Sequence, residues 1–295
     1  MQLTPDNLQH ICGAAVSAAL KAGNLISSYT EKDLEIKNKG IGDTLASQVV
    51  TEVDVMAQEL IVKMLTKVTK LYDLGTLGEE TPDNHERFEK DYFWAIDPID
   101  GTLAFINGEH GYSTSIALVS KAGEPVVGVI FDPMTKTIYQ AIKGQGAFLS
   151  GRKWTVEPRE MEPLSFLNGK SFLEHPLHDA TLKSMETIVK KLGYPGMTSK
   201  FQGGAALIAC WALENDPACY FSFPKKVDGG GSIWDFAASA CIYTEAGGWV
   251  SDIHGNPLDL NRPDSTYLNH RGVLYATNEV LAREIIEVGK RLMKE

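Results

Sequence analysis

Hydrophobic residues recur at helical spacing in two segments near the start of the chain. Thr4 and Pro5 provide a helix start, and the apolar residues that follow recur at helical spacing: Leu8, Ile11, Cys12, Ala15, Ala19, Ala22, Leu25 and Ile26. A second helix is predicted after V-V-T-E-V-D, with an apolar stripe made of Val53, Met56, Ala57, Leu60, Ile61, Met64 and Leu65. Between them, segment 35–48 mixes charge, glycine and small polar residues, which predicts a short strand and then a mobile loop open enough to cover a site.

Short apolar runs in the middle of the chain predict strands. W-A-I at 94–96 is typical of the end of a buried strand. Downstream, S-T-S-I-A-L-V, V-V-G-V-I-F and T-I-Y-Q-A-I are strand-like runs separated by turn sequences such as K-A-G-E-P and D-P-M-T-K. This part of the chain is therefore expected to form an antiparallel meander.

After Trp154 the pattern changes to helices that alternate with strands. Helices are predicted at 178–192, 203–213 and 232–246 and from Glu279 onward, with strands at 219–223 and in G-V-L-Y-A-T. The sequence contains no internal repeat and no low-complexity linker. We therefore expect an N-terminal α+β half over residues 1–155 and a C-terminal α/β half over residues 156–295.

Composition and charge narrow the class of protein. The chain has 295 residues, of which 43% are hydrophobic and 22% are charged, so it can bury a large core. Its 28 basic and 38 acidic residues give a formal net charge of −10, which argues against a nucleic-acid-binding surface. A small phosphate ester can still bind if cations reverse the sign of charge in the site.

The sequence also predicts a cytoplasmic protein. M-Q-L-T-P-D-N lacks the basic start and apolar run of a signal peptide, and no apolar stretch approaches the roughly 18 residues of a membrane span. The four cysteines form no C-x-x-C pair and no zinc spacing, which favours buried thiols over disulfides or a metal cluster: Cys12, Cys210, Cys219 and Cys241.

The stretch W-A-I-D-P-I-D-G-T-L-A-F carries the most informative chemistry. Asp97 and Asp100 flank Pro98, and because Pro98 and Gly101 exclude a regular helix, both acids are expected to project from a tight turn. Two crowded carboxylates repel each other unless cations lie between them, and Mg²⁺ prefers oxygen ligands of this kind. Backbone N–H groups from Gly101 onward are suited to an anion, so the pattern indicates a phosphate site.

Two simpler interpretations of this stretch were weighed. Asp, Pro and Gly are common turn residues, so D-P-I-D-G alone is also compatible with a polar turn. An EF-hand calcium loop is excluded by spacing, because counting from Asp97 places Thr102 at the glycine position and Gly108 at the closing glutamate position.

Further acids occur at element ends elsewhere in the chain. Asp54 lies near the start of the second predicted helix and Asp235 in the first turn of another, where each is also explained by pairing with the helix dipole. Glu79 and Glu80 follow a glycine and would point in different directions in an extended chain, so one of them is free to reach a metal while the other faces solvent.

Three motifs together resemble the inositol monophosphatase family. They are G-E-E-T at 78–81, D-P-I-D-G-T at 97–102, and W-D-F-A-A-S-A followed by T-E-A-G-G at 234–248, in the order and spacing of that family and with a matching acid at Asp54. The superfamily of metal-dependent, lithium-sensitive phosphatases also includes histidinol-phosphate phosphatases, phosphoadenosine phosphate phosphatases and fructose bisphosphatase. The resemblance covers most of the chain and implies a five-layered α-β-α-β-α sandwich with the site between its halves.

The resemblance implies two to three Mg²⁺ ions in the site. Glu79, Asp97 and the carbonyl of Ile99 would hold the first ion. Asp97, Asp100 and Asp235 would hold the second.

The resemblance also implies catalytic and phosphate-binding roles. A third, weaker ion would use Glu79 with waters near Asp54, and Thr102 paired with Asp54 would orient the attacking water. Asp54, Glu79 and Thr102 are thus the expected catalytic residues, and the backbone of Gly101 and Thr102 would hold phosphate oxygens.

The substrate pocket departs from the family pattern. Asp228 stands where inositol monophosphatases have a glutamate that binds a sugar hydroxyl, and Leu103 replaces a common polar residue. The G-G-A-A segment suggests Ala205 as a polyol contact. Lys170, in the N-G-K-S segment, is expected to meet a second phosphate, and Asp100 is expected to contact the substrate as well. The expected partner is a small phosphorylated metabolite such as inositol monophosphate, with no nucleic acid and no membrane, in a chain that the family suggests as a homodimer. Phosphoadenosine phosphate, histidinol phosphate and a non-catalytic phospholigand-binding role remain the alternatives.

Overall fold

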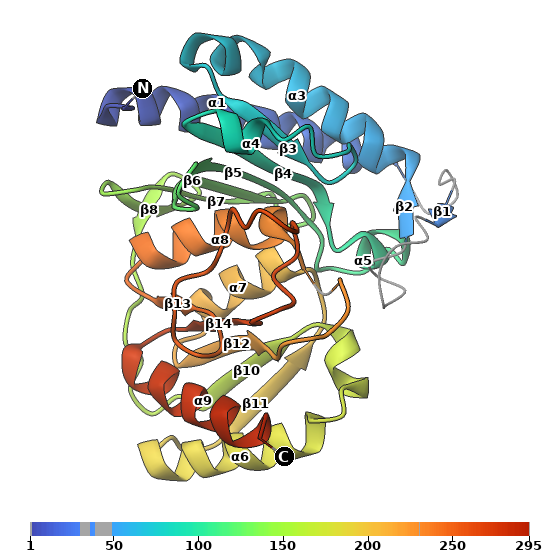
Figure 1. The fold of residues 1–295 in the computed structure, drawn as a ribbon. Helices are drawn as coiled ribbons and strands as arrows, with labels where there is room; N and C mark the ends of the chain where they lie inside the picture. Colours follow the sequence, from blue (N-terminus) through green and yellow to red (C-terminus); the bar gives the residue numbers. More distant parts are fainter. Residues whose placement is uncertain (1, 30–35, 39–48, 230, 295) are drawn as a thin grey trace.

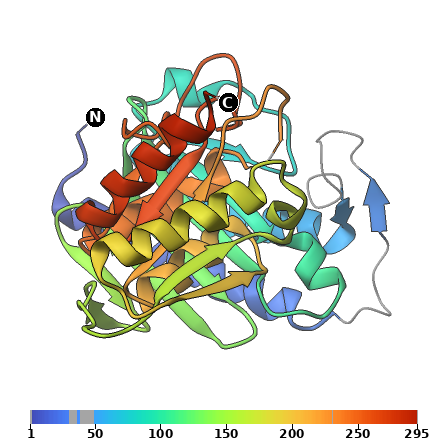
Figure 2. The same ribbon diagram turned by 90° about the horizontal axis from the view of Figure 1, so that it is seen from below.

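The computed structural model describes residues 2–29, 36–38, 49–229 and 231–294, and it stacks helices and sheets in five layers (Figure 1). Helices α1 and α3 form one outer layer, and a seven-stranded sheet lies beneath them. Helices α7 and α8 form the middle layer, followed by a five-stranded sheet and the outer helices α6 and α9 (Figures 1 and 2). The predicted α-β-α-β-α sandwich is confirmed.

Several of the long helices begin at a capping residue, and the one at Thr4 is predicted from the sequence. Thr4 accepts the N–H of Asn7 at the start of α1, and Thr51 and Ser232 form capping boxes at α3 and α8. The long helices are α1 (Pro5–Ile26), α3 (Glu52–Tyr72), α6 (His178–Leu192), α7 (Ala205–Glu214), α8 (Ile233–Glu245) and α9 (Glu279–Leu292). Short helical segments are α4 (Glu86–Glu89), α5 (Thr102–Ile106) and the 3₁₀ helix η2 (Lys170–Glu174).

The larger sheet has the strand order β3-β4-β5-β6-β7-β8-β9, in which only the β3–β4 pair is parallel. The predicted meander is confirmed as β5, β6 and β7. Its strands are β3 (Gly75–Gly78), β4 (Tyr92–Asp100), β5 (Ser113–Ser120), β6 (Pro125–Asp132), β7 (Thr137–Ile142), β8 (Gly146–Leu149) and β9 (Arg152–Trp154).

The smaller sheet has the order β11-β10-β12-β14-β13, with β10 parallel to both neighbours. Its strands are β10 (Leu164–Asn168), β11 (Met197–Phe201), β12 (Ala218–Ser222), β13 (Trp249–Ser251) and β14 (Val273–Ala276). A separate pair joins β1 (Ile36–Asn38) to β2 (Val49–Thr51). The predicted strand within 35–48 is present as β1, whereas the predicted loop at 39–48 lies outside the described residues.

Three clusters of buried side chains hold the layers together. One packs α1 and α3 on the outer face of the seven-stranded sheet, and another packs α6 and α9 on the five-stranded sheet. The third fills the centre, with Phe93 of β4, Ile208 of α7, Ile242 of α8 and Tyr275 of β14 among its members. The two sheets therefore share one central core. The division of the chain into halves at residue 155, between β9 and β10, stays a prediction.

The expected tight turn between Asp97 and Asp100 is wrong. Strand β4 continues to Asp100 and pairs with β5 across a register shift between the two acids. Pro98 is tolerated because β3 ends its pairing at Ile96, so residues beyond that point have a sheet neighbour on one side only. The acids therefore project from an irregular strand end.

Two further properties follow from the described residues. All four cysteines are buried and free, as the sequence suggests. Among the helices that the structure describes, none is both long enough and apolar enough to cross a membrane.

Candidate active site

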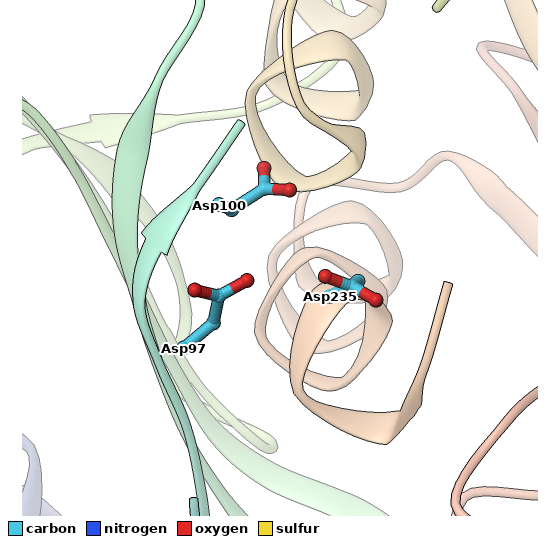
Figure 3. A group of neighbouring side chains, drawn as sticks. All are labelled: Asp97, Asp100 and Asp235. Atoms are coloured by element: carbon cyan, nitrogen blue, oxygen red, sulfur yellow. The ribbon is translucent and has the colours of Figure 1, made fainter. Parts of the chain in front are cut away.

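Three carboxylates converge where strand β4 meets helix α8. Asp97 and Asp100 lie at the end of β4, and Asp235 lies in the first turn of α8. Each offers an oxygen atom within 4.8 Å of the others, and Figure 3 shows the three side chains directed toward one another from the strand and the helix. We call these three residues the acid cluster.

Helix α7 fixes the position of Asp100. The N–H groups of Ala205 and Ala206 donate to Asp100 Oδ1 and Oδ2 at 3.0 and 2.8 Å, so the first turn of α7 holds both carboxylate oxygens. Gly204 precedes them, and its N–H donates to the carbonyl of Gly111 at 2.7 Å. The N-terminal end of α7 thus serves as an anion-binding seat for a side chain of the protein itself.

Asp235 is positioned by its own helix cap. Its carboxylate accepts the N–H of Ser232, which closes the capping box of α8. The hydroxyl of Ser115 on β5 donates to the carbonyl of Trp234 at 2.9 Å and ties this helix end to the larger sheet. Residue 115 lies opposite Asp97 in the β4–β5 pair, so the same strand contact brings Asp97 and Asp235 together.

The acid cluster is electrostatically strained without a counter-charge. Asp97 and Asp100 are only 1% and 5% exposed. Burial raises the pKa of Asp97 well above its usual value, and the charges of Glu79 and Asp235 raise it further. Burial and Asp235 likewise raise the pKa of Asp100, although the Ala205 and Ala206 N–H groups act in the opposite direction. Such a set of oxygen ligands fits a hard divalent cation, which would relieve this strain.

Glu79 approaches the acid cluster from the end of β3. Its N–H donates to the carbonyl of Ile96 at 3.1 Å, and its carboxylate is a charge that raises the pKa of Asp97. It is not part of the group of oxygens within 4.8 Å among the described residues. The neighbouring Glu80 instead donates its N–H to the side chain of Gln58 at 2.9 Å.

A second polar group joins the start of α3 to the start of α5. Asp54 is 1% exposed, and its Oδ2 accepts the N–H and hydroxyl of Thr51 at 2.8 and 2.6 Å. The hydroxyl of Thr102 lies 3.2 Å from Asp54 Oδ1 and 3.1 Å from the carbonyl oxygen of Ile99. The structure therefore brings Asp54 next to Thr102 and Ile99, which lie far from it in the sequence.

Gly101 makes the sharp passage from β4 into α5. Its φ of 90° is in the left-handed region, which favours glycine. A Cβ on this residue would stand 2.7 Å from the carbonyl oxygen of Gly111. Thr102 is the first residue of α5, where helical N–H groups have no carbonyl partner within their own helix.

Of the expected substrate contacts, Asp100 and Ala205 are bonded to each other, and Lys170 and Asp228 have other neighbours. Lys170 forms an ion pair with Glu109. Asp228 is exposed and lies near Arg262, whose pKa it helps to raise, whereas the N–H of Ala205 is engaged by Asp100. The substrate roles of Lys170, Ala205 and Asp228 stay predictions.

Some residues that shape the site were not singled out from the sequence. Ala206 holds Asp100, Gly204 leaves room for the Asp100 carboxylate, and Ser232 holds Asp235. Ser232 is recognisable in retrospect because serine three residues before an acid is a capping-box signature. The role of Gly204 and Ala206 depends on a contact 106 residues away in the chain, which no local pattern contains.

The layered sandwich and its cluster of carboxylates suit a metal-dependent enzyme, and comparisons with known proteins identify the family. The sequence profile described as the Inositol monophosphatase family matches residues 7–293. This chain therefore belongs to the inositol monophosphatase family and is a phosphoric monoester hydrolase that acts on small phosphorylated substrates.

Individual relatives agree with this assignment. The chain is 34% identical over 261 residues to the Nus factor SuhB of Xylella fastidiosa, with 86% of each chain covered. It is 30% identical to inositol monophosphatase 2 of Solanum lycopersicum, covering 86% of this chain and 91% of that protein. The solved structure of the suhB protein from Bartonella henselae superposes with a TM-score of 0.72 at 25% identity, covering 94% of this chain and 97% of the other.

Proposed function

We propose that this protein is a Mg²⁺-dependent phosphomonoesterase that hydrolyses a small polyol or sugar phosphate, such as inositol monophosphate. The observation that carries the proposal is the acid cluster, in which two nearly fully buried carboxylates and Asp235 present oxygens within 4.8 Å of one another. A set of three acids, two of them buried, has little structural benefit without a cation, because burial and mutual repulsion both oppose the ionised forms.

The residues of this chain would hold Mg²⁺ in adjoining positions. Asp97, Asp100 and Asp235 would hold one ion, and Glu79, Asp97 and the carbonyl oxygen of Ile99 another. Bound Mg²⁺ would supply a bound water whose pKa lies below the roughly 15.7 of bulk water, and a positive charge beside the leaving oxygen. A third, weaker ion near Glu79 is part of the same proposal.

The chain itself would orient the water and the phosphate. Thr102 Oγ1, when it donates to Asp54 Oδ1, keeps lone pairs that can accept an O–H of the attacking water. Asp54 is held by two bonds from Thr51, so the acceptor that it offers to the Thr102 hydroxyl has a fixed position. Gly101 and the first amides of α5 would bind phosphate oxygens while the ester bond breaks.

The pocket residues support a polyol over a bisphosphate. The ammonium group of Lys170, the residue considered for a second phosphate, is paired with Glu109. Asp228 would accept hydrogen bonds from substrate hydroxyls, and Ala205 and Asp100 would line the side of the pocket next to α7.

Release of inorganic phosphate from a panel of esters tests the proposal. The panel contains inositol monophosphate, phosphoadenosine phosphate and histidinol phosphate, each with and without Mg²⁺. We expect Mg²⁺-dependent turnover with the highest kcat/KM for the polyol ester. Preference for phosphoadenosine phosphate would overturn the polyol assignment, and turnover unaffected by removal of divalent ions would overturn the metal assignment.

We further propose that the enzyme is inhibited by lithium, is cytoplasmic and forms a homodimer without nucleic-acid partners. The net charge of −10 and the free buried cysteines support the location and the lack of a nucleic-acid partner. Light scattering of the purified chain tests the homodimer, phosphate release in the presence of Li⁺ tests the inhibition, retention on immobilised RNA at low salt tests the nucleic-acid partner, and cell fractionation tests the location.

A further inference from the structure

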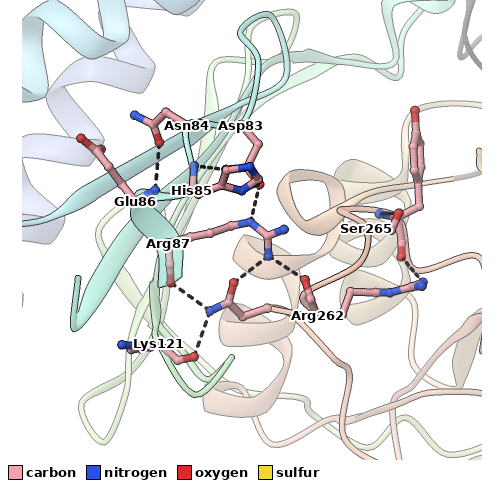
Figure 4. A network of polar contacts seen from close by, with 10 residues as sticks. Asp83, Asn84, His85, Glu86, Arg87, Lys121, Arg262 and Ser265 are labelled. Atoms are coloured by element: carbon pink, nitrogen blue, oxygen red, sulfur yellow. Dashed lines mark hydrogen bonds and ion pairs between the residues drawn. The ribbon is translucent and has the colours of Figure 1, made fainter. Parts of the chain in front are cut away.

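Arg87 is a buried cation that joins distant parts of the chain. Its side chain is 2% exposed and lies in the short helix α4, which is bonded to the edge of the larger sheet. Its Nε donates to Asp83 Oδ2 at 2.7 Å, and its Nη1 donates to Asn261 Oδ1 and to the carbonyl of Arg262, both at 2.8 Å (Figure 4). The side chain of Asn261 returns a bond to the carbonyl of Arg87 at 3.1 Å.

The contacts of Arg87 reach a loop at residues 261–270, which we call the bridging loop. Arg262 donates through Nη1 to the carbonyl of Tyr267 at 3.1 Å and to His270 Nδ1 at 2.8 Å. These bonds hold the end of the loop at residues 267–270 to its beginning at residues 261–262, which Arg87 contacts. The loop therefore behaves as one braced segment.

The bridging loop in turn holds the start of α8. Ile233 donates its N–H to the carbonyl of Thr266 at 2.9 Å, and Leu268 donates to the carbonyl of Gly231 at 3.0 Å. Ser232 and Tyr267 form an isolated antiparallel bridge between these bonds. The N–H of Ser232 donates to the carboxylate of Asp235, so the loop contacts the segment that positions this acid.

On its other side, the segment around Arg87 is attached to β3, the strand that precedes Glu79. The side chain of Glu86 accepts the N–H of Thr76 at 3.1 Å, which attaches α4 to β3, and β3 leads directly into Glu79. The same connection continues into β4, which ends with Asp97 and Asp100. Arg87 thus lies between the segments that carry the acids from β3 and β4 and the loop that braces the acid from α8.

We propose that Arg87, acting through Asn261 and the bridging loop, is a positioning residue that sets Asp235 at its distance from the other acids of the metal site. The inference rests on the proposed function. The distance between Asp235 and the other acids matters because these acids are proposed to share cations. A guanidinium suits this role because it can donate in several fixed directions at once from a buried position, which the ammonium of a lysine does not do.

Calorimetric titration of the metal-free protein with Mg²⁺ tests the role of Arg87. Arg87→Gln should raise the apparent Kd for Mg²⁺ by about tenfold, the range typical of residues that orient metal ligands. Asn261→Ala keeps the guanidinium and its pair with Asp83, so it should produce a smaller rise in the same direction and decides the question if Arg87→Gln does not fold. The effects of the two changes should be less than additive in the double variant, because both interrupt the connection from Arg87 to the bridging loop, although Asn261→Ala also removes a 2.9 Å bond to the carbonyl of Lys121.

Tyr139→Phe is the matched control. Tyr139 is also 2% exposed and connects the larger sheet to α7 through a 2.9 Å bond from its hydroxyl to Glu214. Among the residues that the structure describes, its side chain forms no hydrogen bond to the bridging loop. It should lower the unfolding temperature and leave the Kd for Mg²⁺ within about twofold of wild type. If Arg87→Gln did the same, Arg87 would be a structural residue only and the proposal would be overturned.

Hydrogen exchange gives a measurement that does not depend on metal. In the metal-free protein, Arg87→Gln should accelerate exchange of the amides of Ile233 and Leu268, whose bonds join α8 to the bridging loop, whereas Tyr139→Phe should not. Unchanged exchange would overturn the inference. Wild-type protein that binds no divalent cation would instead overturn the proposed function, and the exchange experiment would still decide whether Arg87 braces α8.

Discussion

Gly204 lies directly against the carboxylate of Asp100, so that a Cβ on residue 204 would stand 2.5 Å from Asp100 Oδ1. Gly204 has a φ of −80°, which other residues also adopt, so the need for glycine comes from this contact and not from the backbone conformation. The close approach lets the first two N–H groups of α7 reach both oxygens of the acid.

Gly204→Ala should therefore displace Asp100 and weaken the metal site. We expect an apparent Kd for Mg²⁺ about tenfold higher and a loss of about 1–3 kcal/mol in the free energy of unfolding. Gly13→Ala is the control, because nothing lies within 4 Å of a Cβ at this position in α1. That variant should gain about 0.5–1 kcal/mol and keep full metal affinity; equal behaviour of the two variants would contradict the contact argument.

Asp97→Asn should separate stability from activity. The amide keeps an oxygen to accept the 3.0 Å bond from the N–H of Ile99 but removes a charge that burial, Glu79 and Asp235 all disfavour. Without divalent ions, we expect the variant to be more stable by about 1 kcal/mol, as measured by urea unfolding, with phosphate release abolished. Near-normal turnover would mean that Asp97 holds no essential cation.

Thr102 offers a test of water orientation. Thr102→Val removes the hydroxyl that lies 3.2 Å from Asp54 Oδ1 and nearly preserves the side-chain volume. We expect kcat to fall by about a hundredfold or more with little change in KM, and Thr102→Ser to recover most of it. A valine variant with normal kcat would remove Thr102 from the proposed mechanism.

His175 predicts a pH dependence of stability away from the metal site. Its ring stacks on Phe172 and Phe223 at 5.5 Å, and its Nδ1 accepts the N–H of Leu177 at 3.1 Å. Burial, and secondarily Lys225, lower the pKa of His175 from its ordinary 6.5. The folded state thus binds this proton less readily than the unfolded state, so the contribution is present above pH 6.5 and is lost as the pH falls through the lowered pKa.

Thermal unfolding of wild type and His175→Asn between pH 7.5 and pH 5 measures this contribution. Asparagine can supply an oxygen near the position of Nδ1 but does not titrate in this range. The unfolding temperature of the wild type should fall further on acidification than that of the variant. Parallel pH profiles would show that His175 does not carry the effect.

Local sequence patterns predicted the long helices best. Thr4 and Pro5 mark the start of α1, and His178–Leu192 was predicted with the bounds that the structure has, because both depend on spacing within one segment. Strand β11 was not predicted, since it is an edge strand whose central side chains are exposed and show no alternation. The continuation of β4 through Pro98 was missed because it depends on where β3 stops.

The site was only partly accessible to sequence reasoning. The pair Asp97 and Asp100 is visible as a motif, but its meeting with Asp235 depends on the packing of α8 against β5, which residue spacing does not contain. The family resemblance supplied that third acid. The N–H groups that hold Asp100 come from α7, and their role became visible only in the folded structure.

The central core that the two sheets share has a consequence for how the molecule denatures. Helices α7 and α8 pack against both sheets, so unfolding of either sheet would expose apolar surface of the helices and of the other sheet. Scanning calorimetry of the metal-free chain should accordingly record a single heat-absorption peak whose calorimetric and van't Hoff enthalpies coincide. Substitutions on either side of residue 155 should then shift one common melting temperature.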